Sequence, residues 1–309
     1  EKELFANQAS LVKIKTEEQK RHGRSFPPNH EVHKLVIAKL GFELTEGQLK
    51  AIKDIEADQL ADIQMMRMLQ GDVGSGKTLV ALLTMLNVVN SGTQTALMAP
   101  TDLLSAQHYQ FFYNALENTN IKVELLTGKT PVKQQLQLKK DLADGNIDIL
   151  IGTHALFQKG VEFKDLGYII IDEQHRFGVE QRLELIKKAS SPDVLVMTAT
   201  PIPRSLTLTM FGDMSVSQLK TKPRNRLPII TSAISSEKRS EVITSLNKKL
   251  QIGEKIYWVC PLIDQSDEIL KTVFSEEENS DLSLFSDVNT RFIELDKAYP
   301  NQVAMLHGK

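Results

Sequence analysis

From residue 44 to residue 198 the chain alternates between short apolar runs and longer segments in which apolar residues recur every three or four positions. The short runs predict β-strands, and the longer segments predict amphipathic helices. Predicted strands cover 65–70, 95–99, 122–126, 147–151, 168–171 and 194–198; predicted helices cover 45–58, 77–90, 102–117, 131–144, 179–188 and 203–210. This alternation predicts an α/β fold, in which a parallel sheet carries helices on both faces.

The segments before and after this core have different patterns. Residues 1–22 have the spacing of an amphipathic helix, and a second short helix begins after Asn29. Gly41 and Gly145 stand where helices end, so both are predicted C-caps. We therefore treat residues 1–41 as a helical connector and 42–222 as a first domain.

A linker-like segment, Lys222–Arg226, precedes a second α/β pattern that covers residues 223–309. The predicted elements here are strands at 228–234, 255–261 and 302–306 and a helix at 237–251. The acidic, serine-rich stretch 275–287 is interpreted as a surface insertion. About three strands make an incomplete fold, so this second domain is expected to be partial.

Composition narrows the class of protein. Hydrophobic residues make up 41% and charged residues 25% of the 309 residues, as in soluble globular proteins. A net charge of −2 gives no global basic field, so any nucleic-acid binding must come from a local patch. No apolar stretch approaches the roughly 20 residues of a membrane helix, and the charged Glu1–Leu4 segment is unlike a signal peptide. These features predict a cytoplasmic protein with no membrane partner.

Cysteine and histidine add little candidate chemistry. The single cysteine, Cys260, lies in the strand-like run 256–260 and is interpreted as a core residue that cannot form a disulfide within the chain. The sequence shows no Cys/His cluster with zinc spacing. His154 and His307 are interpreted as structural.

Residues 71–78 match the phosphate-loop pattern G-x-x-x-x-G-K-[ST] between a predicted strand and a predicted helix. Its glycines allow close backbone approach to phosphates, and its amides point at the anion from a helix N-terminus. Lys77 is expected to reach the β- and γ-phosphates, and Thr78 to bind Mg²⁺. The predicted nucleotide-binding residues are Gly71, Asp72, Val73, Gly74, Ser75, Gly76, Lys77 and Thr78.

Two adjacent carboxylates end the apolar strand 168–171. A continuous apolar run is typical of a central parallel strand, and ligands lie at the carboxyl ends of such strands. Asp172 is therefore expected to orient the Mg²⁺ shell, while Glu173 positions or deprotonates the attacking water. An isolated Asp-Glu pair could also be a solvated loop, but the preceding phosphate loop favours the functional interpretation.

Further segments follow other predicted strands, among them Ala99–Asp102, Leu126–Gly128 and Gly152–His154. Together with Asp172–Val179 and the run Thr198–Arg204, this set resembles superfamily 2 helicases and translocases. More narrowly it resembles the RecG family of bacterial branched-DNA helicases, to which Gln174 points in particular. The resemblance implies a RecA-like P-loop NTPase domain followed by part of a second RecA-like domain.

The resemblance also implies roles for individual residues. Gln48 would recognise adenine, which makes ATP with Mg²⁺ the expected cofactor. Gln174 and His175 would sense the γ-phosphate and connect it to Thr198 and Thr200, which couple hydrolysis to domain movement. Small hydroxyls and amides at strand ends would hold the DNA backbone without reading bases. The residues implied in that contact are Thr101, Thr127, Gly128 and Thr153.

The family implies a monomeric ATP-driven motor that regresses stalled replication forks and moves Holliday junctions. In such enzymes a wedge domain precedes the motor, and the second motor domain supplies an arginine finger. Neither is found in residues 1–309. Because an arginine finger contributes about 10³–10⁵ in rate, this chain alone is expected to bind ATP but hydrolyse it slowly.

Three alternatives remain. The motor of a transcription-repair coupling factor shares the Thr198–Arg204 type of segment but differs at the phosphate loop and at Gln174. A nucleotide-dependent DNA-binding module without unwinding is the second. A small-molecule kinase is disfavoured because it leaves Gln48 and Thr198–Thr200 unexplained.

Overall fold

The structure is a computed structural model that describes most of the chain in two compact units, residues 1–226 and 227–309. The described residues are 22–41, 43–158, 160–173, 188–200, 214–221, 229–263 and 287–307. The N-terminal helix predicted within 1–22, the helices predicted at 179–188 and 203–210, and the insertion 275–287 lie almost entirely outside these ranges.

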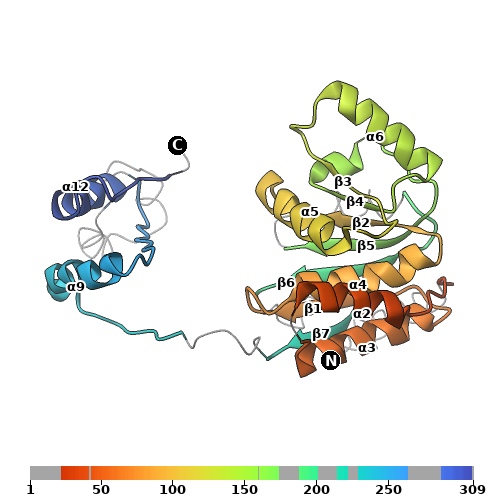
Figure 1. Cartoon of the computed structure of the whole chain (residues 1–309), viewed down its shortest axis with the longest axis horizontal. Helices are drawn as coiled ribbons and strands as arrows, with labels where there is room; N and C mark the ends of the chain where they lie inside the picture. Colours follow the sequence, from red (N-terminus) through yellow and green to blue (C-terminus); the bar gives the residue numbers. More distant parts are fainter. Residues whose placement is uncertain are drawn as a thin grey trace, which may run out of the picture. The chain divides into compact units, whose positions relative to one another are not determined.

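The first unit is built on a seven-stranded sheet in which all neighbouring strands pair in parallel. The strand order is β3-β4-β2-β5-β6-β1-β7 (Figure 1). The strands are β1 (Met66–Gly71), β2 (Gln94–Met98), β3 (Val123–Leu126), β4 (Ile149–Gly152), β5 (Leu166–Asp172), β6 (Asp193–Thr198) and β7 (Ser215–Leu219). Six of them confirm predicted strands, whereas the edge strand β7 was not predicted.

Five helices of this unit are described, and each confirms a predicted helix. They are α2 (His30–Leu40), α3 (Glu46–Leu60), α4 (Lys77–Asn90), α5 (Asp102–Leu116) and α6 (Val132–Asp144), with a short 3₁₀ turn η1 (His154–Phe157). Gly41 and Gly145 adopt left-handed φ angles of 70° and 81°, which confirms both predicted C-caps.

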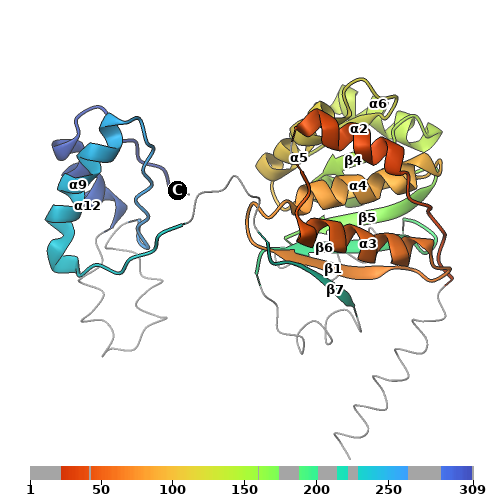
Figure 2. The ribbon, with the colours of Figure 1, turned by 60° about the horizontal axis from the view of Figure 1, so that its bottom comes forward.

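The sheet is covered on both faces. Alternate residues of β5 divide between two cores: Tyr168 and Ile170 face the core formed with α2 to α5, and Ile169 and Ile171 face the core that includes Leu138 and Leu142 of α6. Figure 2 shows α2, α4 and α3 running over the same face of the sheet. This two-sided burial explains why the strand reads as a continuous apolar run.

Helix α4, which follows the phosphate loop, is buried almost all round. Ten successive residues from Leu79 to Val88 are buried, because α4 packs on the sheet beneath α2 and beside α3. Its one buried hydroxyl in mid-helix, Thr84 Oγ1, donates to the Val80 carbonyl at 3.0 Å and lies 3.2 Å from the Tyr168 hydroxyl. The phosphate loop is therefore attached to a helix that is fixed in place by packing on all sides.

The second unit contains the helices α9 (Arg239–Gln251) and α12 (Val288–Ala298) and a 3₁₀ turn, η3 (Ser236–Lys238). Its core consists of Ile243, Leu295 and Tyr299, and the Tyr299 hydroxyl donates to the Ile243 carbonyl. The helix predicted at 237–251 is confirmed, and α12 was not predicted.

The strands predicted in this unit are wrong for the described residues. No strand forms within 229–263 or 287–307, and the apolar side chains of Ile230, Tyr257 and Val259 are 87–90% exposed. Cys260 is partly exposed rather than a core residue. These runs have strand composition, but a strand needs a partner for its backbone hydrogen bonds. Within the described ranges no helix is long and apolar enough to cross a membrane.

Candidate active site

The predicted motifs converge on the carboxyl edge of the sheet. Gln70 of β1 is opposite Thr198 of β6, and Asp172 of β5 is opposite Met197 of β6. The ends of β1, β6 and β5 therefore lie side by side. This edge is where ligands bind in open parallel sheets.

The phosphate loop connects β1 to α4 with left-handed backbone at two glycines. Gly74 has φ 76° and Gly76 has φ 88°, a region that residues with a Cβ rarely adopt. A Cβ on Gly71 would lie 2.6 Å from Ser75 Oγ, so the loop is also closely packed. Ser75 Oγ is buried and has no hydrogen-bond partner among the described residues. The loop thus presents an unsatisfied hydroxyl at a helix N-terminus, the end of a helix at which anions bind.

Lys77 closes onto its own loop in this structure. Its Nζ donates to the Gly71 carbonyl at 2.5 Å and to the Asp72 carbonyl at 3.2 Å. Burial lowers the pKa of Lys77, and the charges of Asp172 and Glu173 partly offset that effect. An anion placed in the loop would relieve this desolvation, which matches the predicted phosphate contact.

Gln48 joins the start of α3 to the phosphate loop. Its Oε1 accepts a hydrogen bond from the Thr45 amide at 2.9 Å, and its Nε2 donates to the Ser75 carbonyl at 2.9 Å. Thr45 and Gln48 form a reciprocal capping box. The side chain is buried, yet an amide has two N–H donors and two acceptor lone pairs, so one of each is left for another partner.

Asp172 is held by two donors. Its Oδ1 accepts from the Glu173 amide at 3.1 Å, and its Oδ2 lies 2.8 Å from Nε2 of His108 on α5. Both side chains are about nine-tenths buried. Sequence reasoning missed His108, because 64 residues separate it from Asp172 and its own surroundings look like an ordinary helix.

Glu173 takes an uncommon backbone conformation directly after β5. Its φ is 48°, and its amide also donates to the Met197 carbonyl at 3.0 Å. Left-handed backbone at a non-glycine residue stores strain that clusters at functional sites. The next two predicted residues, Gln174 and His175, lie outside the described part of the chain.

Thr198 and Thr200 form a small hydroxyl cluster after β6. Their Oγ1 atoms lie 3.1 Å apart, and the Thr200 amide donates to Thr198 Oγ1 at 3.2 Å. Gln70 of β1 donates to the Thr200 carbonyl at 3.5 Å. The cluster therefore touches the strand that leads into the phosphate loop, as a coupling element would need to.

The residues predicted to touch DNA follow β2, β3 and β4, on the other side of β5. Thr101 caps α5 by accepting from the Leu104 amide, and Thr127 Oγ1 accepts from the Lys129 amide. Gly128 is exposed. Thr153 is buried, and its Oγ1 has no hydrogen-bond partner in the described residues. The structure thus gives two of these threonines local structural roles, and sets this group apart from the phosphate loop.

The residues at the edge fit ATP with Mg²⁺. Asp172 and Thr78 offer carboxylate and hydroxyl oxygens, which are the ligands that Mg²⁺ prefers. Ser75 Oγ and the loop amides offer donors to phosphate oxygens. These oxygen ligands and hydrogen-bond donors therefore suit a nucleoside triphosphate with a hard cation such as Mg²⁺. They do not suit a softer metal ion, which would need nitrogen or sulfur ligands.

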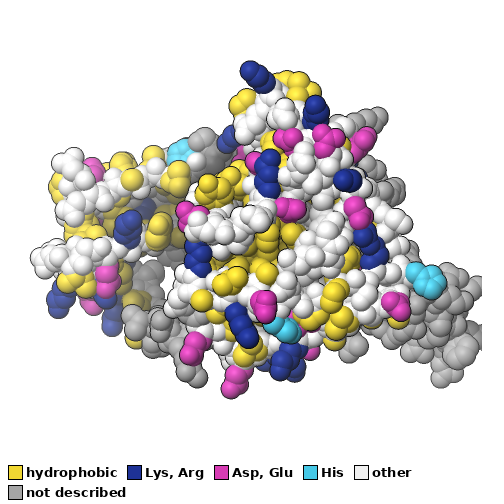
Figure 3. All heavy atoms as spheres, turned by 45° about the vertical axis from the view of Figure 1, so that its right-hand side comes forward, with side chains coloured by type: hydrophobic (Ala, Val, Ile, Leu, Met, Phe, Trp, Pro, Cys, Tyr) yellow, Lys and Arg dark blue, Asp and Glu magenta, His cyan; other side chains and the backbone are white. Residues whose placement is uncertain are grey.

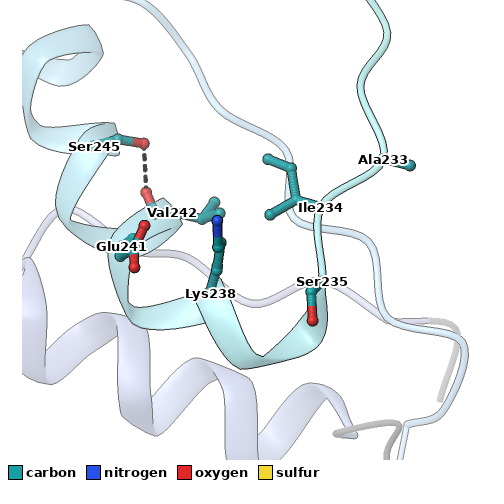
Figure 4. Close-up of a pocket in the computed structure, with 7 residues that line it drawn as sticks. All are labelled: Ala233, Ile234, Ser235, Lys238, Glu241, Val242 and Ser245. Carbon is teal, nitrogen blue, oxygen red and sulfur yellow. Dashed lines mark hydrogen bonds between the residues drawn. The ribbon is translucent and has the colours of Figure 1, made fainter.

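A separate hollow lies within the second unit, and none of the predicted site residues lines it. It has a volume of about 450 Å³ and lies between the N-terminal end of α9 and the segment before it (Figure 4). Its lining includes Ile234, Lys238 and Val242, and Ser245 donates to the Val242 carbonyl at 2.7 Å. Its lining also includes Ser235 and Glu241, but no residue of the phosphate-loop or Asp-Glu motifs, so the motif evidence does not point to it as the active site.

The surface carries no broad basic field on the face drawn in Figure 3, where cationic and anionic side chains are interspersed. Lys129 beside the predicted DNA-contact segment is paired with Asp102 at 3.6 Å. Binding to a nucleic-acid backbone at this face would have to use local groups.

A phosphate loop on a helix N-terminus, with an Asp-Glu pair on a nearby parallel strand, defines a P-loop NTPase of the RecA-like helicase fold. The family profile described as DEAD/DEAH box helicase matches residues 45–209. The chain belongs to the DEAD/DEAH box helicase family.

Among curated proteins, the chain is similar to RecG helicases. The chain is 42% identical to the ATP-dependent DNA helicase RecG of Aquifex aeolicus, over 99% of this chain and 37% of that protein. It is 40% identical to the ATP-dependent DNA helicase RecG of Escherichia coli strain K12, over 91% of this chain and 41% of the relative. The chain therefore spans about two fifths of the length of these relatives.

Solved structures agree with the fold. The structure of RecG bound to a three-way DNA junction superimposes with a TM-score of 0.74 and 37% identity, covering 92% of this chain and 40% of that one. The helicase MrfA bound to DNA gives a TM-score of 0.57 at 20% identity, over 75% of this chain and 36% of that one, which shows the fold alone.

Proposed function

We propose that this chain is the ATP-binding motor region of a RecG-type DNA helicase that acts on branched DNA such as forks and Holliday junctions. The observation that carries the proposal is the meeting of the phosphate loop, the Asp172–Glu173 pair and the Thr198–Thr200 cluster at one edge of the sheet. The identity to RecG helicases over nearly the whole chain supports it.

In this proposal residues 1–41 are the helical connector, 42–222 the first RecA-like domain and 223–309 part of the second. The loop amides and Lys77 bind the phosphates, and Gln48 uses its remaining donor and acceptor on adenine. Thr78 and Asp172 would hold Mg²⁺, which supplies charge neutralisation on the phosphate oxygens. His108 orients the Asp172 carboxylate for that role.

Glu173 is proposed to orient the attacking water, and its strained backbone keeps the carboxylate next to Asp172. Gln174 and His175 are proposed to sense the γ-phosphate. Thr198 and Thr200 are proposed to transmit the structural effect of γ-phosphate release to β1. The contact for this is Gln70, whose side chain donates to the Thr200 carbonyl. Thr101, Thr127, Gly128 and Thr153 are proposed to hold the DNA backbone, and Thr153 must become exposed to do so.

The decisive experiment measures ATP binding and hydrolysis by this chain alone, with a three-way DNA junction and with a linear duplex of equal length. We expect ATP binding that Lys77→Ala removes, together with slow hydrolysis that DNA raises only slightly, and more with the junction than with the duplex. Glu173→Gln should keep ATP binding and lower the hydrolysis rate by about 10² or more, as loss of a positioned base does.

The outcomes separate the alternatives. Equal stimulation by junction and duplex would overturn the branched-DNA assignment but keep the motor. Nucleotide-dependent DNA binding in which Glu173→Gln leaves the rate unchanged would indicate a binding module without a motor. Failure to bind ATP at all would overturn the proposed function.

A further inference from the structure

Two histidines and a glutamate converge on the helical face of the first unit, remote from the sheet edge that carries the nucleotide motifs. Nδ1 of His33 lies 3.7 Å from Oε1 of Glu56, and Nδ1 of His30 lies 3.9 Å from the same oxygen. One potential ligand atom from each residue falls within 4.8 Å of the other two. The histidines are three residues apart on α2, and the glutamate comes from α3.

The backbone hydrogen bond of His33 engages Nε2, and the Asn87 side chain lies beside the same ring. Nε2 of His33 lies 2.8 Å from the Leu83 carbonyl on α4, and a carbonyl oxygen can only accept. Nε2 therefore carries the proton. In the neutral ring Nδ1 then has a lone pair, and this atom lies 3.7 Å from Oε1 of Glu56. A ring nitrogen that donates to a backbone carbonyl is the usual support of a metal-ligating histidine.

Glu56 brings an unsatisfied oxygen to the same point. Its side chain is 10% exposed, and Oε1 has no hydrogen-bond partner among the described residues. Buried polar atoms without partners are rare in folded proteins, and an ion or a water molecule often satisfies them. Two nitrogen lone pairs and one such carboxylate oxygen would all be satisfied by a cation.

We propose that His30, His33 and Glu56 bind one divalent transition metal of the zinc class, with water completing the coordination. Two imidazoles and one carboxylate suit Zn²⁺ or Co²⁺, whereas Mg²⁺ and Ca²⁺ prefer oxygen ligands only. In a tetrahedral zinc site the ligand atoms are about 3.3–3.5 Å apart, given metal–ligand distances near 2.1 Å. The separations of 3.7 and 3.9 Å from Glu56 Oε1 are close to this value. The two imidazole nitrogens, which lie within 4.8 Å of each other, have to approach further, and the exposed His30 can supply that movement.

The metal would fasten the N-terminal helix α2 to the ATP-binding domain. Leu83 and Asn87 of α4 adjoin the site. They come six and ten residues after Lys77, which places them about 9–15 Å from the phosphate loop along the helix axis. The site is thus distinct from the phosphate loop and independent of nucleotide. Since α2 belongs to the proposed connector, metal occupancy would set how firmly the connector is attached to the motor.

The test is a titration of the chelator-treated chain with Co²⁺ in the absence of nucleotide and with Mg²⁺ in excess. We expect one Co²⁺ per chain, with the intense visible absorption of four- or five-coordinate Co²⁺, displaced by Zn²⁺. His30→Ala and Glu56→Gln should each weaken this site by at least about tenfold, because each removes one of three ligands. Zn²⁺ should also raise the melting temperature of the wild-type chain and not that of His30→Ala.

Matched controls keep the proposal open to refutation. His307→Ala removes an exposed histidine in the other unit and should leave Co²⁺ binding unchanged. The side chain of His30 is 65% exposed, so His30→Ala will fold even if the buried variants do not. Equal Co²⁺ affinity in wild type and His30→Ala, or no stoichiometric binding to the wild-type chain, would overturn the proposal.

Discussion

Nε2 of His108 and Oδ2 of Asp172 lie 2.8 Å apart, joining helix α5 to the end of strand β5. Groups that orient a metal-binding side chain from behind typically change metal affinity or activity by about 10–100-fold when they are lost. We therefore predict that His108→Leu raises the Mg²⁺ concentration needed for half-maximal nucleotide binding or hydrolysis by about tenfold.

The matched variant is His108→Gln, whose side-chain amide can still donate to Asp172. It should recover part of the Mg²⁺ affinity, while melting curves report whether both variants fold. If the Mg²⁺ dependence of His108→Leu equals that of the wild type, the hydrogen bond is structural only.

Gly76 is a phosphate-loop position where a side chain would be both crowded and conformationally strained. A Cβ there would lie 2.1 Å from Nε2 of Gln48, and φ is 88°. We predict that Gly76→Ala abolishes ATP binding, measured with a fluorescent ATP analogue, because the loop or Gln48 must move. Gly92→Ala is the control: its φ of 77° is similar, but nothing lies within 4 Å. That variant should lose only about 1–2 kcal/mol of stability and keep its ATP affinity.

Gln48 offers a way to separate loop support from base recognition. Its side chain bonds the Ser75 carbonyl of the phosphate loop, and it is proposed to contact adenine as well. We predict that Gln48→Ala weakens both ATP and GTP, with ATP affected more, in competition binding experiments. Equal weakening of the two nucleotides would assign Gln48 to loop support alone and remove adenine recognition from the proposal.

The burial of Asp193 leads us to predict that the free energy of unfolding depends on pH. Burial raises its pKa to about 7, an effect increased by the charge of Asp58 and partly offset by the Met65 amide and Arg24. The unfolded carboxyl titrates near ~3.9, so between about pH 4 and 7 the folded chain binds more protons than the unfolded one. The free energy of unfolding should therefore fall as pH rises through this range, by an amount on the order of a few kcal/mol.

Urea denaturation measures how the free energy of unfolding changes with pH. The range to cover runs from about pH 4.5 to about pH 8, which spans most of the interval between the unfolded pKa of ~3.9 and the folded pKa of ~7. Asp193→Asn should flatten it, whatever its effect on absolute stability. Asp165→Asn is the control, because its pairing with Arg24 lowers the pKa of that carboxyl and places its contribution below this window. A wild-type chain with no such slope would contradict the prediction.

The elements that local pattern determines were predicted well. Helix α4 occupies residues 77–90 as predicted, because the phosphate loop defines its start and an apolar run continues to Asn90. Strand β5 was recognised from its continuous apolar run, although it begins two residues earlier. The phosphate-loop pattern and the Asp172–Glu173 pair could be recognised in the sequence because their residue types and spacing are themselves the signal, and the roles assigned to them stay predictions.

Other elements depend on partners that sequence does not specify. Strand β7, Ser215–Leu219, has a weak pattern and exists because it pairs with β1 as the edge strand. The runs 229–234 and 255–261 have strand composition but no strand forms there, since β-propensity reflects packing against neighbours more than a backbone preference.

The amino-acid sequence by itself determined the class of fold and located the phosphate-loop pattern and the carboxylate pair that are proposed to bind nucleotide and to act in catalysis, because each motif is encoded within a few consecutive residues. Tertiary structure alone decided that His108 meets Asp172, that Gln48 meets Ser75 and that His33 meets Glu56. These pairs are 64, 27 and 23 residues apart in sequence. Contacts of this kind arise from helix packing on the sheet, where a side chain's partner is set by three-dimensional position rather than by local spacing.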